Sequence, residues 1–235
     1  MNTEKLSQRL EAVANYIPSG SRLADIGSDH AYLPCYAVKR GIVPFAIAGE
    51  VVEGPYQSAK RQVKMEGLDE QIIVRKGNGL EVIAPGEIDC ITIAGMGGAL
   101  IASILEEGKN KLESVKRLIL QPNISAMTIR QWLIDNGWEL KAEEILEEDE
   151  KIYEILVAEK GIPFKPYKDL QKELLLGPFL IKQLSVSFQK KWRNEQKNWQ
   201  RILTQLENAA QSEDTILKKK ELNEKIQMVE EVLNK

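Results

Sequence analysis

Two carboxylates and a glycine follow the first apolar strand of the sequence. Asp25, Gly27 and Asp29 lie in the run Asp25-Ile-Gly-Ser-Asp29. A glycine at a strand end lets the following turn approach a nucleotide-like ligand closely. The common glycine-rich turn carries further glycines at the positions that Asp29 and Ala31 hold here. The side chain of Asp29 therefore lies where a dinucleotide pyrophosphate would pass, which argues against such a ligand.

Polar or glycine residues also follow the next four predicted strands. Ligands of open parallel sheets bind beyond the carboxyl ends of the strands, so these residues should meet at one edge. Glu50, after the second strand, is placed to accept hydrogen bonds from ribose hydroxyls, and the amide of Asn78 to read an adenine amino group. The fourth strand ends in Ala94-Gly-Met-Gly-Gly98 and the fifth in Gln121-Pro-Asn123. Together they predict a nucleoside-type ligand.

Charge distinguishes between the nucleoside ligands. S-adenosylmethionine carries a sulfonium and an ammonium group and has no phosphate. Asp25 and Asp29 would attract it and would repel the pyrophosphate of NAD. No P-loop pattern is present to bind a nucleoside triphosphate. A methyltransferase is therefore favoured, and a nicotinamide dehydrogenase is the weaker alternative.

Apolar strands alternate with helical patterns ahead of these strand ends. Strands are predicted at residues 22–25, 44–49, 71–75, 88–93 and 117–120, and helices at 4–16, 32–40, 54–66, 98–106 and 125–136. This alternation predicts a parallel sheet with helices on both faces. Strands 138–146 and 151–159 are joined only by residues 147–150, which permits an antiparallel hairpin and no parallel crossover. We therefore predict an α/β class: a Rossmann-like, seven-stranded class I methyltransferase sheet.

A catalytic domain is predicted at residues 1–162 and a second, helical domain at residues 163–235. Residues 161–166 read as the linker between them. A long helix is expected to begin at Gly177-Pro178. Apolar residues recur at helical spacing on both sides of a polar break at 211–214: Trp199, Ile202, Leu206 and Ala209, then Leu222, Ile226, Val229 and Leu233. The spacing predicts an antiparallel coiled-coil hairpin, although a dimer would show the same pattern.

Basic side chains are concentrated in this second domain. The net charge of the chain is −3, but residues 163–205 hold 9 Lys+Arg and only 3 Asp+Glu. The imbalance predicts a polyanionic partner. Trp192 and Trp199 share a helix face, which favours a place in the core or the coiled-coil seam over stacking on nucleobases. The candidate phosphate contacts are Lys190, Lys191, Arg193, Lys197 and Arg201.

Other classes of protein are disfavoured. No run approaches the roughly 18 apolar residues of a membrane span, and the chain starts without a signal-peptide core. Cys35 and Cys90 have no metal-ligand spacing and are expected to be buried free thiols. We expect a cytoplasmic protein without a metal, and no feature indicates an obligate protein partner.

The strand-end motifs together resemble those of a known family. Asp25-Ile-Gly-Ser-Asp-His-Ala-Tyr-Leu-Pro34, Ala48-Gly-Glu50, Gly77-Asn-Gly-Leu80, Ala94-Gly-Met-Gly-Gly98 and Gln121-Pro-Asn123 resemble the bacterial tRNA adenine-N1-methyltransferases that modify adenine 22. The resemblance covers the whole chain, including the basic helical tail. One departure is Asn78, where such enzymes often carry aspartate, but its amide can still bond adenine.

This resemblance implies S-adenosylmethionine-dependent methylation of adenine N1 in tRNA, giving 1-methyladenosine. Arg9 would close over the cofactor's carboxylate, and Met96 and Gly97 would line the transfer site beside Asp29. The cofactor-binding set implied by the family is Arg9, Asp25, Gly27, Ser28, His30, Glu50, Val51, Asn78, Gly79, Ala94 and Gly95.

Asp29 is the main catalytic candidate. Adenine N1 already has an in-plane lone pair, and methylation builds positive charge on the ring. A carboxylate that accepts from the exocyclic amino group would orient the ring and offset that charge. Whether Asp29 also takes a proton stays open, as does a role limited to capping the next helix. His30 is a general base or, more favoured, a packing and hydrogen-bonding residue beside the cofactor.

Several alternatives remain at this point. Exocyclic-amine methyltransferases usually end the fourth strand with Asn/Asp-Pro-Pro-aromatic, so Ala94-Gly-Met-Gly-Gly98 argues against N6 methylation. The target adenine must leave its stack, and Tyr32 and Met96 are candidate stacking partners. A methyltransferase of another RNA, a protein or a small molecule stays open, and so does a non-catalytic tRNA-binding protein.

Overall fold

A computed structural model describes residues 2–207 and 212–234, so Ala209 and Gln211 of the predicted hairpin lie outside it. The chain divides into two units. The sheet unit comprises Met1–Glu144 and Tyr153–Pro166, and the helical unit comprises Ile145–Ile152 and Tyr167–Lys235. The helical unit thus includes residues 145–152, which lie ahead of the predicted linker.

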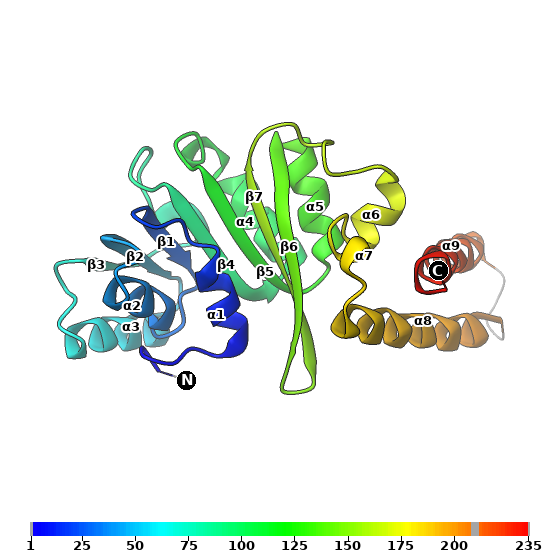
Figure 1. Cartoon of the computed structure of the whole chain (residues 1–235), viewed down its shortest axis with the longest axis horizontal. Coiled ribbons are helices and arrows are strands. Elements are labelled where there is room, and N and C mark those ends of the chain that lie inside the picture. The colour runs from blue at the N-terminus through cyan, green and yellow to red at the C-terminus, as the bar shows by residue number, and fades with distance from the viewer. Residues whose placement is uncertain (1, 208–211, 235) are drawn as a thin grey trace. The chain divides into compact units, whose positions relative to one another are not determined.

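The sheet has the strand order β3-β2-β1-β4-β5-β7-β6 (Figure 1). Its strands are β1 (Arg22–Ile26), β2 (Phe45–Glu50), β3 (Ile72–Lys76), β4 (Cys90–Gly97), β5 (Arg117–Ile124), β6 (Trp138–Glu148) and β7 (Lys151–Lys160). The first five are parallel, and β7 pairs antiparallel with β5. The predicted seven-stranded class I methyltransferase sheet is therefore confirmed. Strand order reverses between β1 and β4, where a ligand crevice is expected.

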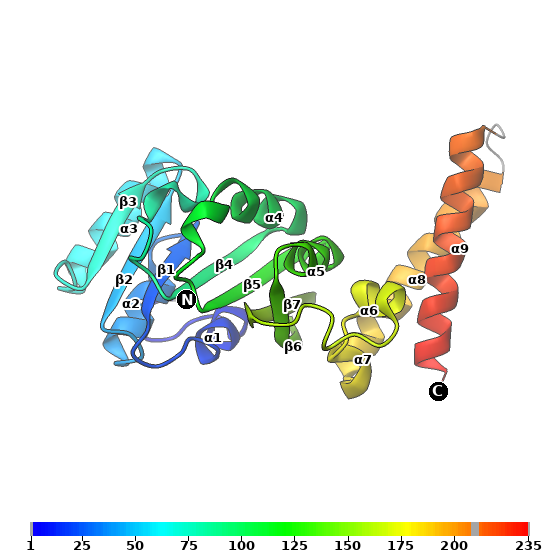
Figure 2. The same cartoon turned by 90° about the horizontal axis from the view of Figure 1, so that it is seen from above.

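Helices cover both faces of this sheet. They are α1 (Gln8–Asn15), α2 (Tyr32–Lys39), α3 (Glu53–Met65), α4 (Gly98–Glu107) and α5 (Ala126–Asp135), with short 3₁₀ turns η1 (Gly79–Val82) and η2 (Lys109–Lys111). Figure 2 shows α1 and α2 on one face and α4 and α5 on the other. Because both faces are covered, the central strands are largely apolar, and Leu23, Ile47 and Ile91 are fully buried.

The β6–β7 hairpin is fixed at its turn and by a buried ion cluster. Asp149 and Glu150 both have positive φ, 49° and 61°, as a two-residue hairpin turn requires. Arg130 of α5 is fully buried and lies 2.6 Å from each of Glu143 on β6 and Glu154 on β7. The two carboxylates offset the burial of the guanidinium and raise the pKa of Arg130.

The helical unit holds α6 (Leu170–Leu176), α7 (Leu180–Gln183), α8 (Val186–Glu207) and α9 (Glu213–Leu233). The prediction of one long helix from Gly177-Pro178 is wrong, because α8 begins at Val186. Gly177 has φ 90° and Leu184 has φ 46°, and both interrupt the helical path.

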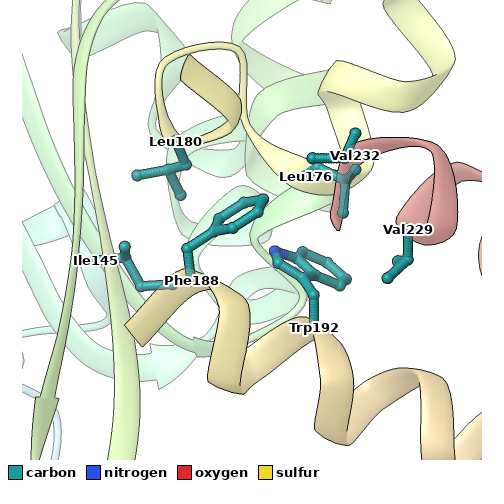
Figure 3. Packing of buried hydrophobic residues seen from close by; sticks show 7 residues of the cluster. All are labelled: Ile145, Leu176, Leu180, Phe188, Trp192, Val229 and Val232. Carbon is teal, nitrogen blue, oxygen red and sulfur yellow. The ribbon is translucent and has the colours of Figure 1, made fainter. Parts of the chain in front are cut away.

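The predicted pairing of two long helices is present in α8 and α9, which lie side by side. Phe188 and Trp192 of α8 pack with Val229 and Val232 of α9 in a buried cluster (Figure 3). Early residues of α8 therefore meet late residues of α9, as in an antiparallel hairpin. Ile145 of the β6–β7 hairpin is buried in the same cluster, which explains why residues 145–152 belong to this unit.

None of the helices within the described ranges combines the length and the apolar character that crossing a bilayer requires.

Candidate active site

A cavity of about 240 Å³ lies at the carboxyl ends of β1 and β4, where the strand order reverses. Its walls come from α1, the β1–α2 turn and the end of β4. The lining residues are Arg9, Leu10, Asp25, Gly27, Ser28, Asp29, Leu33, Ala94, Gly95 and Met96. The cavity thus lies where open parallel sheets bind their ligands.

Asp25 is a buried acceptor at the end of β1, with 4% of its surface exposed. The hydroxyls of Ser28 and Thr92 each donate a hydrogen bond of 2.6 Å to its carboxylate. Burial raises the pKa of Asp25, and the two hydroxyl bonds oppose that effect. The bonds fix the carboxylate and the start of the turn against β4.

The turn after β1 has a strained backbone. Asp29, His30 and Ala31 have φ of 38°, 62° and 54°, a region that non-glycine residues seldom adopt. Such conformations persist only where the surroundings hold them, and they cluster at functional sites. Gly27, with φ 69°, has a left-handed backbone that favours glycine, and a Cβ there would also displace the flexible end of the Met96 side chain, 2.2 Å away.

Glu50 holds the backbone of this turn. The N–H of Asp29 donates to Glu50 Oε1 across 2.6 Å, and Glu50 is only 6% exposed. Burial raises the pKa of Glu50, and the bond from Asp29 counteracts the effect. The Asp29 side chain is 76% exposed, with its Oδ1 3.6 Å from His30 Nε2. The turn therefore holds Asp29 by its backbone and leaves its carboxylate exposed.

His30 stacks on Tyr32, with ring centroids 5.3 Å apart. A stacked ring that also approaches Asp29 fits the packing role predicted for His30. Tyr32, a predicted stacking partner of the target adenine, therefore stacks on His30 in this structure.

Gln121, at the end of β5, connects two walls of the cavity. It is fully buried, and its Oε1 accepts from both the Gly95 N–H, at 3.0 Å, and the Arg9 guanidinium. Asn123 donates to the Gly95 carbonyl across 2.8 Å, and Arg9 lies over the Tyr153 ring, 5.3 Å from its centroid. These contacts hold the Arg9 side chain and the glycine turn in one arrangement.

The predicted site residues fall into two groups. Those that line the cavity are Arg9, Asp25, Gly27, Ser28, Asp29, Ala94, Gly95 and Met96. Those that do not line it are His30, Glu50, Val51, Asn78, Gly79 and Gly97.

The second group lies at neighbouring strand ends. Val51 is 56% exposed directly after β2. The N–H of Asn78 donates to the Glu81 carboxylate at 2.8 Å, which starts η1, and Gly79 turns there with φ 52°. Gly97 ends β4 opposite Ile124 of β5.

Sequence reasoning gave no role to Gln121, Asn123, Leu10, Leu33 or Tyr153. For Gln121 and Asn123 the sequence offered one signal, namely their position at the end of the fifth predicted strand. Leu10 and Tyr153 gave none, because an apolar or aromatic residue within a helix or strand does not indicate which cavity or which distant side chain it contacts.

The donor set suits a cationic nucleoside ligand. Asp25, Asp29 and Glu50 place three carboxylates around the β1 turn, and the bare turns at Gly27 and Gly95 let a ligand approach the backbone. A sulfonium and ammonium ligand such as S-adenosylmethionine fits this set, whereas a pyrophosphate does not.

Both cysteines, Cys35 and Cys90, are buried free thiols, and burial raises the pKa of each to about 12. Across the described ranges there is no group of three or more His, Cys, Asp or Glu side chains that could hold a metal ion.

Known proteins resemble this chain over nearly its whole length. The family model for tRNA (adenine(22)-N(1))-methyltransferase matches residues 23–231. The tRNA (adenine(22)-N(1))-methyltransferase of Bacillus subtilis (strain 168) is 54% identical over 236 residues, covering 100% of this chain and 99% of that protein.

Solved structures show the same relationship. The crystal structure of the Bacillus subtilis tRNA methyltransferase TrmK matches with a TM-score of 0.95 and 53% identity, over 98% of this chain and 99% of its own. A Streptococcus pneumoniae protein in complex with S-adenosyl-L-methionine matches with a TM-score of 0.87 and 47% identity, over 97% of this chain and 100% of its own. The similarity therefore includes both units.

Proposed function

Since the chain belongs to the tRNA (adenine(22)-N(1))-methyltransferase family, we propose that it transfers a methyl group from S-adenosylmethionine to N1 of adenine 22 in tRNA. The cavity at the ends of β1 and β4 is the proposed site of transfer. One observation carries this assignment: Asp29 lines the cavity with an exposed carboxylate on a backbone that Glu50 holds. A held, exposed carboxylate at the cavity supports a catalytic role over that of a non-catalytic tRNA-binding protein.

S-adenosylmethionine supplies an electrophilic methyl group when it is bound. Asp25 and Ser28 would hold its methionine part in the β1 turn, with Arg9 toward its carboxylate. Glu50 and Val51 would face the ribose. Asn78 and Gly79 would take the adenine ring, because they lie at the neighbouring end of β3.

The target base needs orientation more than activation. Adenine N1 has a lone pair in the ring plane, so no base has to create the nucleophile. Attack on the methyl group builds positive charge over N1 and the exocyclic amino group. Asp29 would accept a hydrogen bond from that amino group, which aligns N1 and offsets the charge as it develops. The same carboxylate would accept a proton that the amino group releases after transfer.

The helical unit would contact the tRNA backbone. Lys190, Arg193, Lys197 and Arg201 are all exposed and follow one another by three, four and four residues, so they share one face of α8. We call these four the basic stripe. Lys191 lies off the stripe, with its ammonium group 5.1 Å from the Trp192 ring centroid.

The stripe is partly engaged within the protein. Lys190 forms an ion pair with Glu147 at the tip of the β6–β7 hairpin. Arg193 and Arg201 donate hydrogen bonds to uncharged partners along α8, Gln189 and Asn198. Phosphate contacts of this kind give affinity without reading sequence, so the stripe would orient tRNA and leave base choice to the cavity. We also propose a cytoplasmic location, on the ground that tRNA is found there.

Product identification tests the proposed function. The full chain is incubated with a tRNA transcript and methyl-labelled S-adenosylmethionine, and the digested nucleosides are separated. We expect labelled 1-methyladenosine, and no label in a control tRNA that carries guanosine at position 22. Label in N6-methyladenosine, or label that persists in the control tRNA, would contradict the proposal.

A further inference from the structure

An uncharged surface with three exposed apolar side chains lies beside the cavity, where β4 and β5 end. Leu100 is in the first turn of α4, Ile124 ends β5 and Met127 is in the first turn of α5. Their exposed fractions are 53%, 69% and 39%. We call these three residues the strand-end patch.

The patch is continuous with the cavity. Met96 lines the cavity, and the next residue, Gly97, pairs with Ile124 in the sheet. A Cβ at Gly97 would lie 3.9 Å from Ile124 Cγ1, so the two positions are in contact distance. The patch therefore begins directly beside the proposed transfer site.

The three residues of the patch lie at the same edge of the sheet, where β5 ends and α4 and α5 begin. Helices α4 and α5 lie side by side (Figure 2). Trp132 Nε1 donates to Glu106 across 2.8 Å, and these residues lie six positions after Leu100 and Ala126. The first turns of the two helices, which carry Leu100 and Met127, thus flank the end of β5.

Backbone packing presents Ile124 rigidly. Ser125, the next residue, is left-handed with φ 61°. A Cβ at Gly98 would lie 2.1 Å from the Ser125 carbonyl oxygen, so only glycine lets α4 start this close to the turn. The backbone at Ile124 is therefore held in place, and little backbone freedom would be lost when this residue binds a partner.

The exposure of this patch calls for a partner. Isolated exposed apolar residues are ordinary, but a contiguous group beside a reaction site marks an interaction surface. Neither residues 94–105 nor residues 118–129 include a charged side chain. No carboxylate in these segments would repel a phosphate backbone, and apolar side chains suit the faces of nucleobases.

We propose that the strand-end patch is a wedge that contacts the tRNA bases next to adenine 22 when that adenine enters the cavity. The inference rests on the proposed function. A base must leave its stack to reach such a cavity, at a free-energy cost. Proteins that unstack nucleic acids insert Ile, Leu or Met between base steps to offset that cost. Ile124 is the central wedge residue, and Leu100 and Met127 flank it.

The test compares two substrates with the Ile124→Ala variant. One is folded tRNA, and the other is a tRNA in which the nucleotide opposite adenine 22 is abasic, so that the adenine is already released. The rate constant kcat/KM for methylation should fall about tenfold on folded tRNA and less than about twofold on the abasic tRNA. Ile124→Leu should retain activity on both. Met65→Ala, which removes an 81% exposed side chain from α3, is the matched control and should change neither.

Each other outcome overturns the inference. An unchanged rate on folded tRNA removes the wedge role, and an equal loss on both substrates assigns Ile124 to the reaction centre instead. Wild-type protein that makes no 1-methyladenosine would overturn the proposed function itself. An active wild type with an unaffected variant would overturn this inference alone.

Discussion

Glu50 Oε1 accepts the backbone N–H of Asp29 across 2.6 Å, so the acid that ends β2 holds the backbone of the proposed catalytic residue. In a methyltransferase this bond would couple the cofactor's ribose, which Glu50 is expected to face, to the position of Asp29. Glu50 thereby helps to hold the left-handed backbone of the turn.

Replacing Glu50 by Gln tests this coupling. The variant loses the charge and one acceptor, and we expect kcat/KM for S-adenosylmethionine to fall about tenfold or more. Steady-state kinetics with saturating tRNA measures the effect. Glu53→Gln removes an exposed acid from the first turn of α3 and is the control, since it should stay within about twofold of wild type. Similar kinetics for both variants would contradict the coupling.

Gln121→Leu should separate Arg9 from the Gly95 turn. The substitution keeps the volume but removes the acceptor that the Gly95 N–H and the Arg9 guanidinium share. A hydrogen bond to a charged group contributes about 1.5–3 kcal/mol, so we expect the Kd for S-adenosylmethionine to rise by about tenfold. Calorimetric titration of the cofactor measures this. Gln131→Leu, on the exposed side of α5, should leave the Kd unchanged, and an unchanged Kd in Gln121→Leu would remove the positioning role.

The pKa of Asp25 is raised by burial, and this predicts a pH-dependent gain in stability for Asp25→Asn. A carboxyl whose pKa is higher in the folded state stabilises the fold when protonated, and that contribution is lost as pH rises through the folded-state pKa. The ionised carboxylate of the cofactor-free wild type therefore costs stability at neutral pH.

Thermal unfolding of wild type and Asp25→Asn across pH measures this effect. The melting temperature of the variant should exceed that of wild type at pH 7, and the difference should shrink toward acid. Asp89→Asn is the control of opposite sign, because the Arg22 N–H bond lowers the pKa of Asp89. A difference in melting temperature for Asp25→Asn that grows on acidification would be inconsistent with a buried carboxyl whose pKa is raised.

The basic stripe predicts a salt-dependent contribution to tRNA binding. Changing Arg193, Lys197 and Arg201 together to Gln should weaken tRNA binding at low salt and flatten the plot of log K against log salt, by about one unit of slope for each lost phosphate contact. Filter binding over a salt series measures this. Changing Lys218 and Lys220 of α9 to Gln is the control, because these lysines form ion pairs with Glu221 and Glu224. A slope that does not change would remove the stripe from the tRNA interface.

Much of the fold was predictable, because strands and helices alternate with clear periodicity and the short 147–150 connection allows only a hairpin. The start of α8 was not. Gly177-Pro178 has the composition of a helix start, but the left-handed Leu184 breaks the path, and a leucine gives no sign of that conformation.

The site was predictable where motifs sit at strand ends and obscure where contacts are distant in sequence. Asp25, Asp29 and Gly95 lie at or just beyond the ends of strands whose carboxyl ends must meet, so the sheet alone brings them together. The bond between Arg9 and Gln121 joins residues 112 positions apart, and no spacing rule connects them. The buried Gln121 was therefore recognised only from the structure.

Single-turnover methylation by Asp29→Asn tests the central claim most directly. Enzyme saturated with S-adenosylmethionine is mixed with tRNA, and the rate of 1-methyladenosine formation is compared with wild type. We expect the rate to fall by about 10²–10³-fold, as for loss of other groups that stabilise developing charge, while the Kd for the cofactor changes by less than about threefold. A rate for Asp29→Asn within about twofold of wild type would contradict the catalytic assignment of Asp29.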